Sequence, residues 1–134
     1  MRTINSYIIG IDFDGTCVTH EYPNVGKDIG AQRVLKRILE NKHKLILNTM
    51  RSEINKLDEA LNWFNINEIE LYGVNKNKTQ FTWTRSPKVH CQLFIDDAAL
   101  GCPLKYDPEI SERPFVDWDR VEKMLEEMGI LKNG

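Results

Sequence analysis

Two short apolar stretches of the sequence are each followed by two aspartates. These four carboxylates are Asp12, Asp14, Asp96 and Asp97. Neighbouring carboxylates repel one another, and partial removal from water adds a cost of several kcal/mol per ion unless an opposite charge compensates for it. Stability alone therefore does not explain four acids in these positions. A divalent cation is the natural compensation, and a site made only of oxygen ligands favours Mg²⁺.

The elements that must position these acids are expected to be short strands. The stretch 7–11 precedes the first pair, the stretch 91–95 precedes the second, and the stretch 44–49 ends in Asn48 and Thr49. Short and continuously apolar stretches are typical of strands that are buried on both faces of a sheet. Three strand ends are thus expected to carry polar side chains.

Amphipathic helices are expected between and after the strands, because apolar residues recur there at helical spacing. The apolar faces are Ala31, Val34, Leu35, Ile38 and Leu39 in the first helix, Ile54, Leu57, Leu61 and Phe64 in the second, and Val121, Met124, Leu125 and Met128 in the last. Ser52 is placed to cap the second helix and Asp117 the last, which Gly129 stops. Further strands are expected at 69–74 and 114–116.

This alternation predicts an α/β fold with three α/β/α layers, Rossmann-like, in which helices cover both faces of a mainly parallel sheet of about five strands. The length of 134 residues suits a single domain that spans 1–134. In sheets of this kind the ligand binds outside the carboxyl ends of the strands. The polar strand ends are therefore expected to meet in one site.

The composition gives no general attraction to polyanions. The formal net charge is −2, so any affinity for phosphate is expected to be local. Three cysteines have neither the number nor the spacing of a disulfide framework or a Cys-x-x-Cys metal site. The first residues lack the pattern of a signal peptide, and the stretch 7–11 is too short to cross a bilayer. We expect a cytoplasmic protein that does not bind membranes.

The sequence Asp-Phe-Asp-Gly-Thr at 12–16 resembles the first motif of the haloacid dehalogenase superfamily. Thr49 resembles the second motif of that superfamily, Lys88 the third and the pair Asp96-Asp97 the fourth, and the similarity runs from about Tyr7 to Gly101. The resemblance implies the strand order 3-2-1-4-5. It also implies a form without a large cap domain, because the gaps between the motifs leave room only for a small flap and a loop.

The resemblance implies a Mg²⁺-dependent phosphatase in which Asp12 attacks phosphorus and forms an aspartyl-phosphate. Asp14 would protonate the departing oxygen and then deprotonate the attacking water, which requires surroundings that keep a carboxyl protonated near neutral pH. An acid at this position argues against dehalogenation. The ion would be held by Asp12, the backbone carbonyl of Asp14 and Asp96, with Asp97 helping directly or through water.

The remaining residues that match the motifs of the superfamily, together with some of their neighbours, would bind the phosphoryl group and the substrate. The Thr49 hydroxyl would donate a hydrogen bond to a phosphoryl oxygen, and Lys88 would neutralise negative charge at the reacting centre. Lys76 and Lys78 are the alternatives for this lysine. Phe13, Asn48 and Arg51 are the candidate substrate-binding residues. Arg51 either binds a second phosphate or simply begins the second helix.

An open site of this kind suits a nucleotide, a polynucleotide end or a small phosphorylated metabolite. Two other classes of function stay open, namely a phospho-accepting regulatory domain of the receiver type and a non-catalytic phosphate-binding protein. A phosphoryl group that persists for minutes would favour the receiver. Basic and aromatic residues alternate at Lys76, Lys78, Phe81, Trp83 and Arg85. Such a stretch can stack on bases, so contact with nucleic acid also stays open, whereas the sequence does not predict an oligomeric state.

Overall fold

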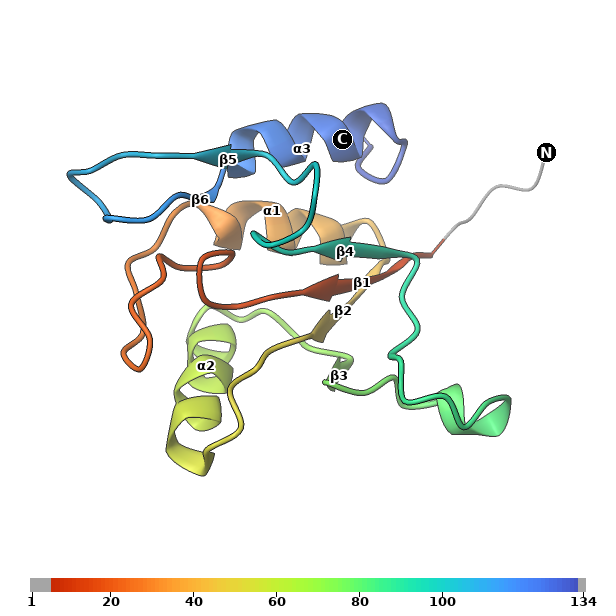
Figure 1. Ribbon diagram of the computed structural model, residues 1–134. Helices are drawn as coiled ribbons and strands as arrows, with labels where there is room; N and C mark the ends of the chain where they lie inside the picture. The colour runs from red at the N-terminus through yellow and green to blue at the C-terminus, as the bar shows by residue number, and fades with distance from the viewer. Residues whose placement is uncertain (1–5, 133–134) are drawn as a thin grey trace.

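The structure is a computed structural model, which describes residues 6–132. In chain order its elements are β1 (Ile8–Ile11), α1 (Ala31–Glu40), β2 (Lys44–Leu47), α2 (Ile54–Ile66), β3 (Gly73–Val74), the 3₁₀ turn η1 (Gln80–Thr82), β4 (Leu93–Ile95), β5 (Leu104–Lys105), β6 (Phe115–Val116) and α3 (Trp118–Glu127). Four of the strands form one parallel sheet in the order β3-β2-β1-β4 (Figure 1). The predicted α/β class and the first four positions of the predicted strand order are confirmed.

The strand expected at 114–116 forms, but it does not extend this sheet. β6 pairs antiparallel with β5, with Leu104 opposite Val116, and the two make a separate sheet. The backbone N–H of Val116 donates to the carbonyl of Gly15 at 3.1 Å, and that of Asp117 donates to the carbonyl of Pro103 at 2.9 Å. These bonds hold β6 beside the loop that follows β1, so that it does not pair with the edge of β4.

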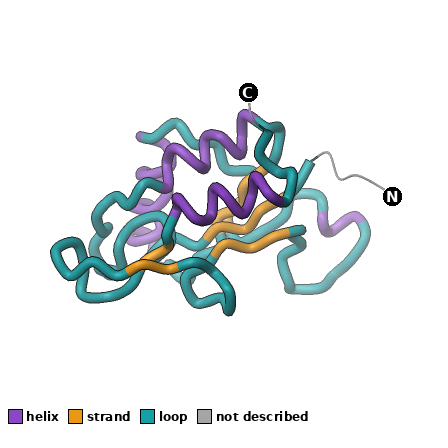
Figure 2. Tube along the Cα trace, turned by 90° about the horizontal axis from the view of Figure 1, so that it is seen from above, coloured by secondary structure: helices purple, strands orange, loops and turns teal. Residues whose placement is uncertain are grey.

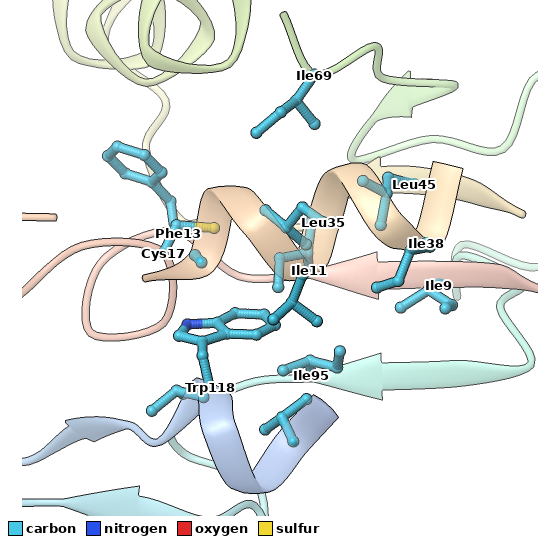
Figure 3. Packing of buried hydrophobic residues seen from close by; sticks show 14 of the residues in the cluster. Ile9, Ile11, Phe13, Cys17, Leu35, Ile38, Leu45, Ile69, Ile95 and Trp118 are labelled. Carbon is cyan, nitrogen blue, oxygen red and sulfur yellow. The ribbon is translucent and has the colours of Figure 1, made fainter. Parts of the chain in front are cut away.

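One hydrophobic core fills the sheet face to which Ile9 and Ile11 point. Ile9 pairs with Leu45 and Ile11 with Leu47, so all four side chains lie on the same face. α1 connects β1 to β2, and α2 connects β2 to β3, so both connections move in the same direction across the sheet. Because such connections are right-handed, both helices lie on the same face of the sheet. Figure 3 shows how these elements and α3 bury their side chains together: Ile9, Ile11, Phe13, Leu35, Ile38, Leu45, Ile69, Ile95 and Trp118.

The opposite face of the sheet meets the segment 75–92 in place of a long helix. A side chain at Gly10 would meet the ring of Phe94 and the sulfur of Cys91 on this face. Those two residues line a cavity of about 260 Å³ together with residues of the segment, among them Trp83. The helical cover expected on both faces is reduced here to η1, because the segment lacks the apolar periodicity that a longer helix needs.

Four local expectations are corrected by the structure. Ile54 is 78% exposed and does not belong to the buried face of the second helix. Ser52 does not cap the second helix, which begins at Ile54 without a side-chain hydrogen bond at its N-cap. The strand expected at 69–74 is limited to β3. Met124 and Met128 are 42% and 50% exposed, so the buried face of α3 rests on its other apolar residues. Asp117 does cap this helix, as predicted, because its side chain accepts the N–H of Arg120.

The segment between β1 and α1 is a compact turn followed by a small flap. The N–H of Cys17 donates to the carbonyl of Phe13 at 2.8 Å, which closes the turn directly after the first aspartates. Residues 19–27 form the flap, whose base is closed by a bond from the N–H of Thr19 to the carbonyl of Lys27 at 2.9 Å. No cap domain is present among residues 6–132, as expected. Within the same range, no helix combines the length and the apolar character that spanning a bilayer requires.

Candidate metal centre and active site

Three carboxylates meet where β1 and β4 end. The two strands are neighbours, with Ile11 opposite Ile95, so the residues that follow them emerge side by side. One carboxylate oxygen each from Asp12, Asp96 and Asp97 lies within 4.8 Å of the others. We refer to these three residues as the three-carboxylate centre. The sequence predicted this meeting, since parallel strands bring their carboxyl ends to one edge.

Thr16 joins the two halves of the three-carboxylate centre. Its hydroxyl oxygen accepts the backbone N–H of Asp97 at 3.0 Å and lies 2.9 Å from Oδ2 of Asp12 and 3.2 Å from Oδ1 of Asp97. A hydroxyl has one proton, so it donates to one of these carboxylates at a time. Sequence analysis assigned no role to this side chain, although its place in the 12–16 motif was the available signal.

Gly15 leaves room for the carboxylate of Asp97. Its φ of 84° lies in the left-handed region, which glycine adopts without strain. A Cβ at this position would also collide with Oδ2 of Asp97. Both facts explain why a glycine follows Asp14 in this turn.

The surroundings of Asp12 oppose a negative charge in the metal-free protein. Burial raises the pKa of Asp12 to about 8, and the hydrogen bond with Asp97 and the negative charge of Asp96 act in the same direction. Hydrogen bonds from Thr16 and from the backbone of Phe13 act in the opposite direction but are outweighed. A cation at the centre would oppose this shift, because its positive charge favours the ionised form of Asp12 and offsets the neighbouring carboxylates.

The donor set of the three-carboxylate centre fits a hard divalent cation. All three side chains offer oxygen, and no sulfur or imidazole belongs to the group among the described residues. Mg²⁺ is commonly held by one or two carboxylates and completes its shell with water and substrate oxygens. The carboxylate of Asp14, predicted as part of this region, lies outside the group, so only its backbone carbonyl is left as a candidate ligand.

Asp14 instead forms a two-pronged ion pair with Arg51. Nε of Arg51 lies 2.8 Å from Oδ2 and Nη2 lies 2.7 Å from Oδ1 of Asp14. The other donors of Arg51 reach the carbonyls of Asn24 at 3.0 Å and Lys56 at 2.9 Å. The side chain of Arg51 is 1% exposed, and its hydrogen bonds to Asp14 raise the pKa of the guanidinium.

Two aromatic rings flank this guanidinium. Cζ of Arg51 lies 5.1 Å from the ring centroids of both Phe13 and Tyr22, a distance at which a cation is attracted to the face of a ring. Arg51 thus ties the flap to Asp14, and four of its five N–H groups have acceptors within the protein. The side chain of Phe13 is 0% exposed, so its ring is buried and not open to a substrate.

A cavity of about 490 Å³ opens over the three-carboxylate centre. The predicted site residues that line it are Asp12, Asp14, Thr49, Arg51, Asp96 and Asp97. The N–H of Thr49 donates to Oδ1 of Asn75 at 2.8 Å, which fixes the end of β2 beside the site. Asn48 is not part of the lining. The rest of the wall consists of His20 and Tyr22 of the flap, Met50, Ala98 and Arg113. Nothing in the sequence pattern pointed to Arg113.

The structure does not bring Lys88 to this cavity. Lys88 precedes β4, so it lies towards the amino edge of the parallel sheet, and it lines the separate cavity of about 260 Å³. Figure 1 shows the segment at the end of the sheet where β1 and β4 begin. The alternatives Lys76 and Lys78 line two further cavities. No described lysine reaches the wall of the candidate site.

The fold and the site define an α/β protein whose parallel sheet carries an acidic, metal-suited centre at its carboxyl edge. Figure 2 shows the strands and helices of this arrangement from above. A solved structure of a conserved protein from Bacteroides thetaiotaomicron is similar, with 34% sequence identity, a TM-score of 0.75 and coverage of 92% of this chain and 93% of that chain. The chain belongs to the same family as this conserved protein. No protein-family model and no curated protein matches the sequence.

Proposed function

We propose that the chain is a Mg²⁺-dependent phosphomonoester hydrolase of the haloacid dehalogenase superfamily that acts through an aspartyl-phosphate. The observation that carries this proposal is the three-carboxylate centre, in which the motif residue Asp12 lies against Asp96 and Asp97 under an open cavity. Thr49 and Asp14 line the same cavity. The cavity volume lies in the range typical of small-molecule sites.

Asp12 is the nucleophile in this proposal. Its carboxylate attacks phosphorus, the bond from phosphorus to the departing oxygen breaks, and water later releases the phosphate from Asp12. Asp12, Asp96 and Asp97 would hold Mg²⁺, which when bound supplies positive charge for the carboxylates and the phosphoryl oxygens. Thr49 lines the cavity, and its hydroxyl oxygen accepts the backbone N–H of Arg51 at 3.2 Å, so the hydroxyl proton would donate to a phosphoryl oxygen.

Asp14 moves the protons of both steps, and Arg51 constrains how it does so. Both oxygens of its carboxylate accept N–H groups of Arg51, which fixes the direction in which the carboxylate points. Protonation of the departing oxygen in the first step and activation of water in the second depend on how freely this held carboxylate reaches them. Substrates whose leaving oxygen needs little protonation, such as aryl phosphates, are therefore the best first probes. As substrate class we propose a phosphorylated small molecule, a nucleotide or a polynucleotide end in the cytoplasm.

The same ion pair favours one second candidate. If Arg51 keeps Asp14 from moving protons, the aspartyl-phosphate is hydrolysed slowly and the chain acts as a phospho-accepting regulatory domain. The lifetime of the phosphoryl group separates the two functions, since a hydrolase discharges it within a turnover and a receiver retains it for minutes.

The test is the hydrolysis of a chromogenic aryl phosphate with Mg²⁺, with EDTA, and by the Asp12→Asn variant. Asp58→Asn is the matched control, because Asp58 is an exposed aspartate of α2 that does not line the site cavity. The proposal predicts metal-dependent turnover in the wild type and the control, and none in Asp12→Asn. Turnover that survives the loss of Asp12 would contradict it.

A further inference from the structure

The candidate site contains one cation that no carboxylate neutralises. Arg51 is paired with Asp14, whereas Arg113 lines the same cavity and forms no ion pair within residues 6–132. Arg113 lies between β5 and β6, beyond the last motif, and its side chain is exposed. An unpaired arginine beside three carboxylates calls for an anionic partner from outside the protein.

His20 of the flap contacts the guanidinium of Arg113 in the wall of the cavity. Nη1 of Arg113 lies 3.3 Å from Nδ1 of His20. A guanidinium can only donate, so Nδ1 is the acceptor and the ring proton resides on Nε2. The imidazole therefore orients Arg113 without taking up its charge.

The segments that carry these two side chains also hold each other. Oγ of Ser111 donates to Oε2 of Glu21 at 3.2 Å, and Nζ of Lys27 donates to the carbonyl of Ile110 at 2.9 Å. The flap and the β5–β6 segment are thereby joined at two points besides the His20–Arg113 contact. This bracing distinguishes Arg113 from an arginine on a free loop.

The charge balance of the cavity shows what Arg113 supplies. Three ionised carboxylates and one divalent cation leave a single net negative charge, which would repel a phosphate ester. The Asp14–Arg51 pair adds nothing to this balance, and no described lysine lines the cavity. The positive charge of Arg113 neutralises this remaining negative charge, and two N–H groups of its planar guanidinium match two oxygens of a phosphoryl group.

We propose that Arg113, oriented by His20, binds the phosphoryl oxygens of the substrate and supplies the positive charge that the sequence assigned to Lys88. The expected effect of Arg113 on the rate of hydrolysis rests on the proposed phosphohydrolase function. Its expected effect on phosphate binding does not depend on turnover, because orthophosphate alone offers the same oxygens to the guanidinium.

The experiment compares Arg113→Gln and Arg113→Lys with two control variants, Lys88→Gln and Arg85→Gln, the second an exposed arginine on the segment 75–92. Aryl phosphate hydrolysis gives kcat and KM, calorimetry with saturating Mg²⁺ gives the Kd of orthophosphate, and circular dichroism reports the fold. Loss of a group that stabilises transition-state charge costs on the order of 100-fold in rate. We expect a loss of this order in kcat/KM and about tenfold weaker orthophosphate binding for Arg113→Gln, with partial recovery in Arg113→Lys.

Both controls are expected to stay within about twofold of the wild type, as surface changes away from a site usually do. Arg113→Gln with unchanged kcat/KM and orthophosphate affinity would overturn the inference, and so would a loss that appears in Lys88→Gln instead. If the wild type shows no turnover at all, the proposed function fails, and the orthophosphate Kd alone still decides whether Arg113 binds the anion.

Discussion

Magnesium binding is expected to release the proton that Asp12 carries in the metal-free protein. The pKa of Asp12 is raised to about 8 by burial, by Asp97 and by Asp96, whereas a metal ligand must be ionised. Below this pKa the proton competes with the ion, so the apparent Kd for Mg²⁺ falls as the pH rises. The fall is about tenfold per pH unit, or about 1.4 kcal/mol, up to pH ~8, and the Kd is level above it.

At pH 7, which lies below the pKa of about 8, the metal-free protein is expected to carry a proton on Asp12 in most molecules, so Mg²⁺ binding should release protons. Calorimetric titration in two buffers with different heats of ionisation measures the number of protons released, and titrations from pH 6 to pH 9 give the slope. Asp12→Asn should bind Mg²⁺ more weakly and lose the slope. A wild-type Kd that varies less than twofold between pH 6 and pH 8, without proton release, would refute the reasoning, because Asp12 would then be no ligand or no proton carrier.

Three further predictions concern stability and geometry. Asp12→Asn should raise the free energy of unfolding of the metal-free protein by about 2 kcal/mol, as measured with urea. This gain should grow from pH 5 to pH 8, because a raised carboxyl pKa costs the wild type stability over this range. An unchanged free energy of unfolding would contradict the repulsion among the three carboxylates. Arg51→Gln should lower the free energy of unfolding by about 3 kcal/mol, since a buried carboxylate loses its partner, and Arg51→Lys should recover part of it; a loss below about 0.5 kcal/mol would show that the ion pair contributes little. Gly15→Ala should weaken Mg²⁺ binding about tenfold, because the added Cβ displaces the carboxylate of Asp97. Gly129→Ala is the control: Gly129 has a similar φ of 78° but open space around it, so this change should strain the backbone without changing the Kd for Mg²⁺. Equal Mg²⁺ affinities in both variants would contradict the proposed collision with Asp97.

The sequence carried enough information to predict the sheet and the acids at its edge. Short apolar stretches indicate strands that are buried on both faces, and parallel strands bring their carboxyl ends to one edge, so Asp12 and Asp96 were expected at the same edge of the sheet. The order of the first four strands followed from the resemblance carried by the motif at 12–16. These features depend on local patterns that recur in every parallel sheet.

The parts that the sequence did not predict depend on contacts between distant loops. Arg51 was expected at the site and lines the cavity, but its contacts with the flap residues Tyr22 and Asn24 were not predicted, because no local pattern reports them. Lys88 was matched by its order along the chain, whereas its position depends on the aperiodic segment 75–92. Arg113 reaches the cavity through the bracing of the flap against the β5–β6 segment, which involves residues about 90 positions apart.

The most direct test of the central claim is a search for the phosphoryl group on Asp12. Asp14→Asn should slow the hydrolysis of the aspartyl-phosphate more than it weakens Mg²⁺ binding, so this variant is incubated with an aryl phosphate and Mg²⁺, quenched in acid and mapped by peptide mass spectrometry. The account predicts phosphorylation of the peptide that contains residue 12, and none when Asp12→Asn is added to the variant. Turnover by the wild type with no phosphoryl group on this peptide, or with the group on another residue, would contradict the account.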